Sequence, residues 1–105
     1  MNAIPPSVCL LSYTYVDGML ERRKPHREEH LAHVGRFSAE RGLVIAGATG
    51  DPPSGALFVF EGDPDAATEA EAFREADPYV AAGLVVASRI EPWTVVTNRP
   101  FGSGA

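Results

Sequence analysis

The feature that most constrains the fold is the order in which short apolar runs and amphipathic runs alternate along the 105 residues. Four runs rich in β-branched, aromatic and aliphatic side chains predict strands, at residues 8–15, 43–50, 55–62 and 84–96. Two runs with proline and acidic residues near their starts predict helices, at residues 25–41 and 63–76. The order β-α-β-β-α-β predicts a ferredoxin-like α+β sandwich, an antiparallel four-stranded sheet with two helices on one face.

The connections between these runs carry turn signals that agree with this order. Asp-Gly follows the first strand, and the sequence DPPS separates the second and third runs, which predicts a hairpin. The second helix is expected to begin with Asp63 as its N-cap and to stop before Pro78. Pro92 lies inside the last run and predicts an edge, a bulge or a bend, because proline cannot donate to a strand ladder.

The third strand carries apolar side chains on both of its faces. Ala56, Phe58 and Phe60 alternate onto one side, and Leu57 and Val59 onto the other. Two helices cover only one face of such a sheet. We therefore expect a homodimer that packs through the sheet face.

Length and composition indicate a single domain over residues 1–105, with an ordered part at about residues 8–96 and a tail at each end. The net charge of −5 and the lack of a lysine- and arginine-rich stripe predict no nucleic-acid binding. No apolar run reaches the roughly 18 residues of a membrane helix and no signal-peptide pattern is present, so we expect a cytoplasmic protein without membrane attachment. The one cysteine, Cys9, is expected to be a packed core thiol rather than a nucleophile.

All three histidines lie in the first predicted helix: His26, His30 and His33. With Val34 at the centre of the apolar face, Leu31 and Phe37 flank it at about 60° on either side. His30 falls inside this sector, whereas the other two histidines fall toward its edge. An inward histidine can be a hydrogen-bonded core residue or a functional group, and periodicity alone favours the core residue.

Asp77 stands at the end of the second predicted helix, where the macrodipole disfavours a carboxylate. Its spacing from Phe73 places it on the core-facing side. Either Asp77 only caps a short turn in PYVAAG, or another group holds it. Because the two helices of this fold lie side by side, His30 is the group that we expect to hold it. A carboxylate that accepts from one imidazole nitrogen fixes the tautomer and suits the other nitrogen to move protons near neutral pH.

Four pieces of sequence occur in an order and spacing that characterise a known family. They are REEHLAHV with Arg27 and His30, GLVIAGA, GALFVFEG, and ADPYVAAGLV with Asp77. On these pieces the chain resembles the YciI-like (YCII-related) family over roughly residues 8–96. The resemblance implies a dimeric α+β barrel with a His-Asp dyad, which falls on His30 and Asp77. One characterised relative removes chloride from a chlorinated hydroxyhydroquinone, and similar barrels include muconolactone isomerases.

Two functions remain open at this point. The first is a small enzyme that uses no cofactor and performs proton transfer, such as elimination, dehydrochlorination or isomerisation, on an aromatic or lactone-like substrate. In it His30 is the general acid or base, Asp77 orients it, and the expected substrate-binding residues are Arg27, Arg22, Arg23 and Tyr79. The alternative is a non-catalytic small-ligand-binding or interaction module with a structural His-Asp pair. The histidine spacing predicts no metal site.

Overall fold

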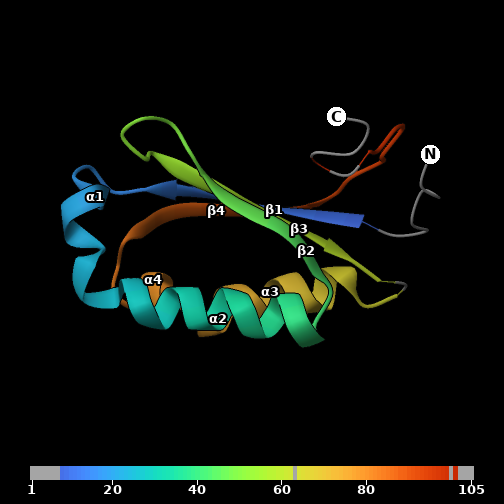
Figure 1. Cartoon of the computed structure of the whole chain (residues 1–105), viewed down its shortest axis with the longest axis horizontal. Coiled ribbons are helices and arrows are strands. Elements are labelled where there is room, and N and C mark those ends of the chain that lie inside the picture. Colours follow the sequence, from blue (N-terminus) through green and yellow to red (C-terminus); the bar gives the residue numbers. More distant parts are fainter. Residues whose placement is uncertain (1–7, 63, 100, 102–105) are drawn as a thin grey trace.

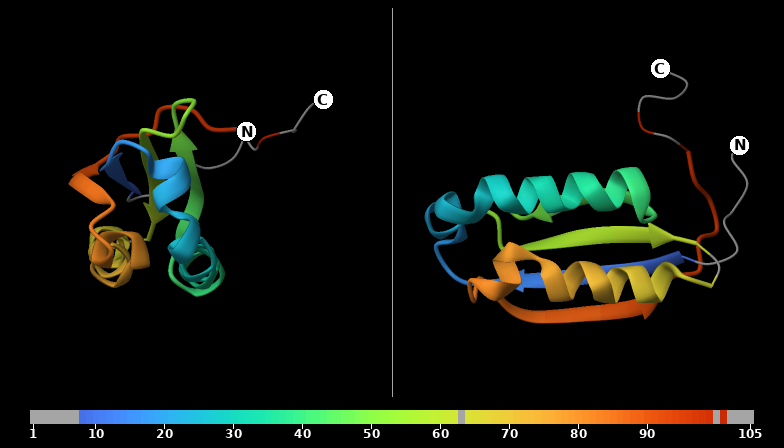
Figure 2. Two further views of the ribbon diagram at one scale, coloured as in Figure 1. Left: turned by 90° about the vertical axis from the view of Figure 1, so that its left-hand side faces the viewer. Right: turned by 90° about the horizontal axis from the view of Figure 1, so that it is seen from below.

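The computed structural model describes residues 8–62, 64–99 and 101. Four antiparallel strands form one sheet in the order β2-β3-β1-β4: β1 (Val8–Tyr15), β2 (Leu43–Thr49), β3 (Gly55–Glu61) and β4 (Val85–Pro92). Two main helices, α2 (Arg27–Glu40) and α3 (Ala66–Ala76), lie side by side across one face of this sheet (Figures 1 and 2). The predicted α+β, ferredoxin-like fold is confirmed.

The core lies between the two helices and the inward faces of the central strands. Leu11 of β1 pairs in register with Phe58 of β3, and both are buried together with Phe60 and with Phe73 of α3. The predicted inward face of the third strand is therefore confirmed. Cys9 is a packed core thiol, as expected, and burial raises the pKa of its thiol.

Two element boundaries differ from the sequence prediction by three residues or more. Helix α3 begins at Ala66, because a turn closed by the hydrogen bond from Ala66 N–H to the Gly62 carbonyl precedes it. Its N-cap is Asp65, and Asp63 lies outside the described residues. Strand β4 ends at Pro92 instead of continuing to residue 96, and the chain then leaves the sheet (Figure 1). Proline lacks the N–H that would continue the ladder, and β4 is an edge strand, as Pro92 had suggested.

Residues 19–26, where the sequence predicted no element before the helix expected from residue 25, form two short helical segments. Helix α1 (Met19–Arg22) follows Gly18, whose φ of 74° is the left-handed conformation that glycine adopts without strain. A 3₁₀ turn, η1 (Lys24–His26), then leads into α2. None of the helices in the described part of the chain is long and apolar enough to cross a membrane.

The buried face of α2 is rotated from the one that the periodicity predicted. His33, expected toward the edge, is only 2% exposed, whereas Leu31, expected on the apolar face, is 49% exposed. The cause is helix α3, which lies beside α2 and covers its His33 side: the His33 ring packs against Phe73 of α3 with centroids 4.5 Å apart. The buried face of α2 is therefore formed by His30, His33 and Phe37 and is not centred on Val34.

Candidate active site

Asp77 is placed by the proline that follows it. Pro78 disfavours a helical conformation for the preceding residue, and Asp77 accordingly leaves α3 with ψ at 123°. A second short helix, α4 (Pro78–Ala81), begins at this point, and Asp77 is its N-cap: a carboxylate oxygen accepts a hydrogen bond from Tyr79 N–H at 3.0 Å. The cap predicted for the PYVAAG turn is therefore present. It uses only part of the carboxylate.

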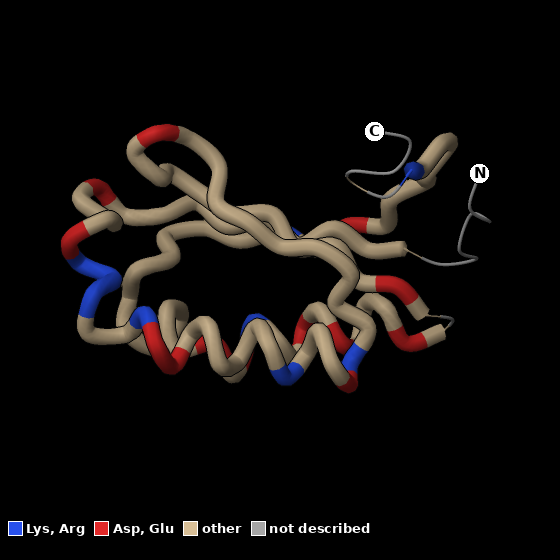
Figure 3. The backbone as a smooth tube through the Cα atoms, in the orientation of Figure 1, with Lys and Arg blue, Asp and Glu red and all other residues tan. Residues whose placement is uncertain are grey.

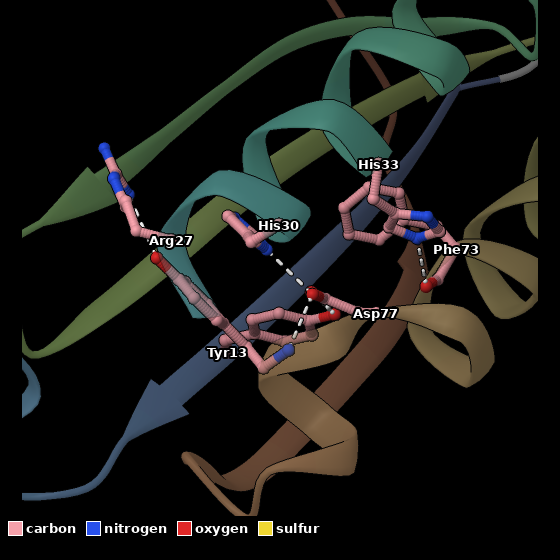
Figure 4. A network of polar contacts seen from close by, with 7 residues as sticks. Tyr13, Arg27, His30, His33, Phe73 and Asp77 are labelled. Atoms are coloured by element: carbon pink, nitrogen blue, oxygen red, sulfur yellow. Dashed lines mark hydrogen bonds and ion pairs between the residues drawn. The ribbon is translucent and has the colours of Figure 1, made fainter. Parts of the chain in front are cut away.

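The rest of the Asp77 carboxylate meets His30 and Tyr13 (Figure 4). Nδ1 of His30 lies 2.7 Å from Asp77 Oδ1, and the Tyr13 hydroxyl donates to Oδ2 at 2.8 Å. Both explanations offered for Asp77 thus hold together, because one carboxylate caps α4 and bonds to a histidine of α2. The side chain of Asp77 is completely buried, so all of its hydrogen-bond partners are protein groups.

The hydrogen-bond pattern indicates which nitrogen of His30 carries a proton. Two groups, the Tyr13 hydroxyl and Tyr79 N–H, donate to the Asp77 carboxylate, which suits its ionised form, and an ionised carboxylate can only accept. Nδ1 of His30 is therefore the protonated nitrogen. Burial, followed by the negative charge of Asp77, raises the pKa of the Tyr13 hydroxyl above its usual range, so Tyr13 stays a donor to the carboxylate.

An aromatic stack fixes the plane of the His30 ring. The Tyr79 ring lies parallel to it, with 4° between the planes and 3.7 Å between the centroids. The Tyr79 hydroxyl in turn accepts a hydrogen bond from Nη1 of Arg27 at 3.2 Å, a contact that Figure 4 marks beside the Arg27 side chain. His30 is thus held by a hydrogen bond at one edge and by an aromatic ring on one face.

Nε2, the second ring nitrogen of His30, remains available. It makes no hydrogen bond to any described residue. In the same described part of the chain, Asn98 Oδ1 is the one fully buried side-chain polar atom without a partner. Nε2 therefore has no partner among the described residues, in a side chain that is only 4% exposed.

The predicted cationic residues occupy different positions around this end of the sheet, where Figure 3 shows lysine and arginine at the bend between α1 and α2. Burial, then the neighbouring Tyr79 and Asp77, raises the pKa of the Tyr15 hydroxyl, and the positive charges of Arg27 and Arg23 oppose this rise. The positive charges of both arginines therefore lie close enough to the Tyr15 hydroxyl to affect its pKa. The stem of Arg22 instead lies over Gly18, at the start of its own helix. The predicted roles of all three arginines in binding a substrate stay predictions.

Two residues that belong to this network carried little signal in the sequence. Tyr13 was recognisable only as an aromatic residue of a strand, and the register that aims its hydroxyl at Asp77 is a property of the sheet. His33 bonds through Nε2 to the carbonyl of Phe73 at 2.8 Å, and its burial depends on the position of α3.

Among residues 8–62, 64–99 and 101, no group of three or more His, Cys, Asp or Glu side chains is placed to hold a metal ion.

The fold and this site define a ferredoxin-like α+β protein with a buried histidine-aspartate pair between a helix and a helix N-cap. The model of the YCII-related domain matches residues 7–94, so the chain belongs to that family. A search of curated proteins finds no match.

Several solved structures share the fold. 5-Chloro-2-hydroxyhydroquinone dehydrochlorinase from Burkholderia phenoliruptrix, solved as a complex with 2,5-dihydroxybenzoquinone, is 25% identical with a TM-score of 0.66, over 83% of this chain and 93% of its own. A NIPSNAP family protein from Agrobacterium tumefaciens is 20% identical with a TM-score of 0.58, over 90% and 97%. A putative antibiotic biosynthesis monooxygenase from Nitrosomonas europaea is 10% identical with a TM-score of 0.55, over 91% and 96%. The last two support the fold alone.

Proposed function

We propose that this protein is an enzyme that catalyses proton transfer without a cofactor, with His30 as general acid and base and Asp77 as the residue that orients it. The observation that carries the proposal is the hydrogen bond of 2.7 Å between His30 Nδ1 and Asp77 Oδ1, together with an Nε2 that bonds to no described residue. A buried carboxylate that holds one imidazole nitrogen leaves the other free to take and return protons. The dehydrochlorinase with the same fold supports elimination as the reaction class.

The proposed reaction begins at a carbon–hydrogen bond next to a carbonyl group. Nε2 of His30 removes the proton, and the electron pair of the C–H bond becomes that of an enolate. In dehydrochlorination this pair forms a carbon–carbon double bond while chloride leaves with the electrons of the C–Cl bond, and the proton passes from His30 to water. In isomerisation His30 instead returns the proton to another carbon. Neither route needs an oxidant or a reductant.

The substrate that we propose is small, aromatic or lactone-like, and anionic at one end. Tyr79 is completely buried and stacked on His30, and its hydroxyl accepts a hydrogen bond from Arg27, so a planar substrate that reaches Nε2 has a cation close by. Arg27 and Arg23 both exert a positive field on the Tyr15 hydroxyl, which favours a negatively charged group at this place. Positioned acid-base catalysis contributes roughly 10²- to 10⁴-fold, which suits a substrate whose proton is already activated.

We also propose that the protein works as a homodimer that closes its open sheet face into an α+β barrel. Leu10 of β1 and Ile45 of β2 are both in register with Val59 of β3, so an apolar stripe crosses three strands on the face without helices. Leu57 on the same face is 42% exposed. Analytical ultracentrifugation should give twice the chain mass, and Leu57→Lys should shift it to the monomer. A wild-type chain that sediments as a monomer would contradict the dimer.

We expect the proposed reaction to occur in the cytoplasm.

Turnover of small substrates tests the enzymatic proposal. Chlorinated hydroquinones and enol-lactones are offered to the wild type, to His30→Ala and to Asp77→Asn, and chloride release or the ultraviolet spectrum is followed. Activity in the wild type should disappear in His30→Ala and fall strongly in Asp77→Asn, because asparagine donates as well as accepts and no longer fixes the tautomer. Turnover that survives in His30→Ala would remove His30 from the mechanism.

One observation favours the alternative, a non-catalytic module that binds a small ligand or a partner. His30 is 4% exposed and stacked against Tyr79, as expected for a buried histidine whose hydrogen bond only stabilises the core. On this alternative, ligands such as 2,5-dihydroxybenzoquinone bind to wild type and to His30→Ala with similar affinity and no substrate is consumed. Calorimetric titration of both variants separates the two functions.

A further inference from the structure

His33 is a buried titratable side chain that the proposed reaction does not use. It lies one helical turn after His30 on α2 and is 2% exposed. Nε2 of its ring is 2.8 Å from the main-chain carbonyl oxygen of Phe73, on helix α3. A carbonyl oxygen only accepts, so Nε2 of His33 carries the proton and donates it.

The carbonyl that His33 reaches has no helical partner. In an uninterrupted helix the carbonyl of Phe73 would accept from the N–H four residues later, which belongs to Asp77. Asp77 has left the helical conformation because of Pro78, and its N–H bonds to the carbonyl of Arg74 at 3.4 Å. His33 therefore caps the last turn of α3 from a neighbouring helix, which is the turn that leads directly to Asp77.

Helix α2 thus contacts this turn at two places. His30 bonds to the side chain of Asp77, and His33 bonds to the main chain four residues before it (Figure 4). The aromatic rings around His33 strengthen the second contact, since Phe37 and Phe73 lie with their centroids 4.8 Å and 4.5 Å from it. Because α2 holds this turn at both ends, the position of Asp77 relative to His30 is fixed by the packing of α2 against the end of α3.

We infer that His33 is a positioning residue for the dyad, which fixes the end of α3 so that the Asp77 carboxylate meets Nδ1 of His30. Without its bond, the last turn of α3 has a buried carbonyl unpaired and is free to shift or to bond elsewhere. A displacement of about 1 Å at a catalytic group can cost about 10²-fold in rate. The inference rests on the proposed function only for this effect on turnover.

The test follows the proton on Nδ1 of His30 by nitrogen-15 NMR, which needs neither substrate nor turnover. In the wild type this proton should be visible and slow to exchange with solvent. His33→Phe keeps a ring in the same space and removes the donor, and it should speed the exchange of the His30 proton by about 10-fold or more, as expected for a locally opened contact. His33→Gln keeps a donor of similar reach and should restore slow exchange.

The matched control is Phe37→Leu, which disturbs the same aromatic cluster and leaves the bond from His33 to Phe73 intact. It should lower stability while leaving the His30 proton slow to exchange. If His33→Phe and Phe37→Leu have the same effect on this proton, or if neither has one, His33 is only a core residue and the inference is wrong.

A further pair of variants covers the case in which His33→Phe does not fold. Asparagine at position 33 is too short to reach the Phe73 carbonyl, whereas glutamine is long enough. Fast exchange of the His30 proton in His33→Asn together with slow exchange in His33→Gln supports the inference, and equal exchange in the two contradicts it. A failure to find any substrate would overturn the proposed reaction but would leave this NMR result unchanged.

Discussion

His30 and His33 lie on the same helix, both are buried, and they use opposite nitrogens of the ring. His30 donates from Nδ1 to a carboxylate, while His33 donates from Nε2 to a main-chain carbonyl. The difference arises from the neighbouring segment, because one histidine faces the N-cap of α4 and the other faces the last turn of α3. The same residue type is suited to proton transfer or to structural support according to what the opposite helix presents to it.

Besides the hydrogen bonds of His30 and His33, helix α2 makes a third side-chain contact with the segment that packs beside it, an ion pair near its C-terminal end. Arg41, at the C-terminal end of α2, makes a two-pronged ion pair with Glu69 of α3, and its guanidinium lies 4.8 Å from the Phe37 ring centroid. The Arg41 side chain is 44% exposed, unlike either histidine. The arginine lowers the pKa of Glu69, and Glu69 raises the pKa of Arg41. The three connections thus range from a buried charged contact to a solvent-exposed one.

The largest difference should appear when the two histidines receive the same substitution. His30→Gln removes the proposed acid-base group and should lower turnover by about 10²- to 10⁴-fold. His33→Gln retains a donor toward the Phe73 carbonyl and should keep turnover within about 10-fold of the wild type. Steady-state assays on a substrate identified with the wild type provide the measurement. Equal losses in the two variants would mean that the histidines do not differ in role.

Removing the donor at position 33 should affect stability next. His33→Phe leaves the buried carbonyl of Phe73 without a partner, and the free energy of unfolding should fall by about 1–3 kcal/mol. Urea unfolding followed by circular dichroism measures the change. His33→Gln serves as the control and should recover most of the loss. If His33→Phe is as stable as the wild type, the Phe73 carbonyl accepts a hydrogen bond from another donor.

Alkaline pH should separate the Tyr13–Asp77 contact from the rest of the core. The pKa of Tyr13 is raised in the folded protein, so its contribution to stability is complete below the ordinary tyrosine pKa of about 10 and declines as pH rises above that value. Between about pH 10 and 11, the free energy of unfolding of the wild type should therefore fall more steeply with pH than that of Tyr13→Phe, and the difference in slope should correspond to about half a proton at pH 10 and nearly one at pH 11. Urea unfolding at a series of pH values gives both slopes. Parallel slopes would show that Tyr13 ionises as freely in the folded chain as in the unfolded one.

The smallest effect is expected at the exposed connection. Arg41→Ala removes the ion pair with Glu69 and should lower the free energy of unfolding by less than His33→Phe does, because solvent screens exposed charges. The effect should shrink further in 1 M salt. A loss comparable to that in His33→Phe would indicate that the outer ends of α2 and α3 depend on this pair more than its exposure suggests.

The sequence alone was enough to predict the order of strands and helices and to single out His30 and Asp77, which the structure brings to 2.7 Å. Strand β1 spans residues 8–15 as the apolar run predicted, since a run of β-branched and aromatic residues bounded by Asp-Gly has few alternatives. His30 and Asp77 were found because helical periodicity points both toward the core, and periodicity is a local property that the sequence carries directly. The hydrogen bond between them followed from the fold, which places the two helices together.

The neighbours that these elements meet could not be predicted in this way, because they depend on how the elements pack. His33 is buried because α3 covers that side of α2, and Tyr13 reaches Asp77 because the sheet places β1 beneath the end of α3. The assignment of the proton on each histidine also depends on whether a carboxylate or a carbonyl stands opposite. A sequence pattern fixes directions within one helix or strand, whereas the rotation and spacing between elements come from the packing of all their side chains at once.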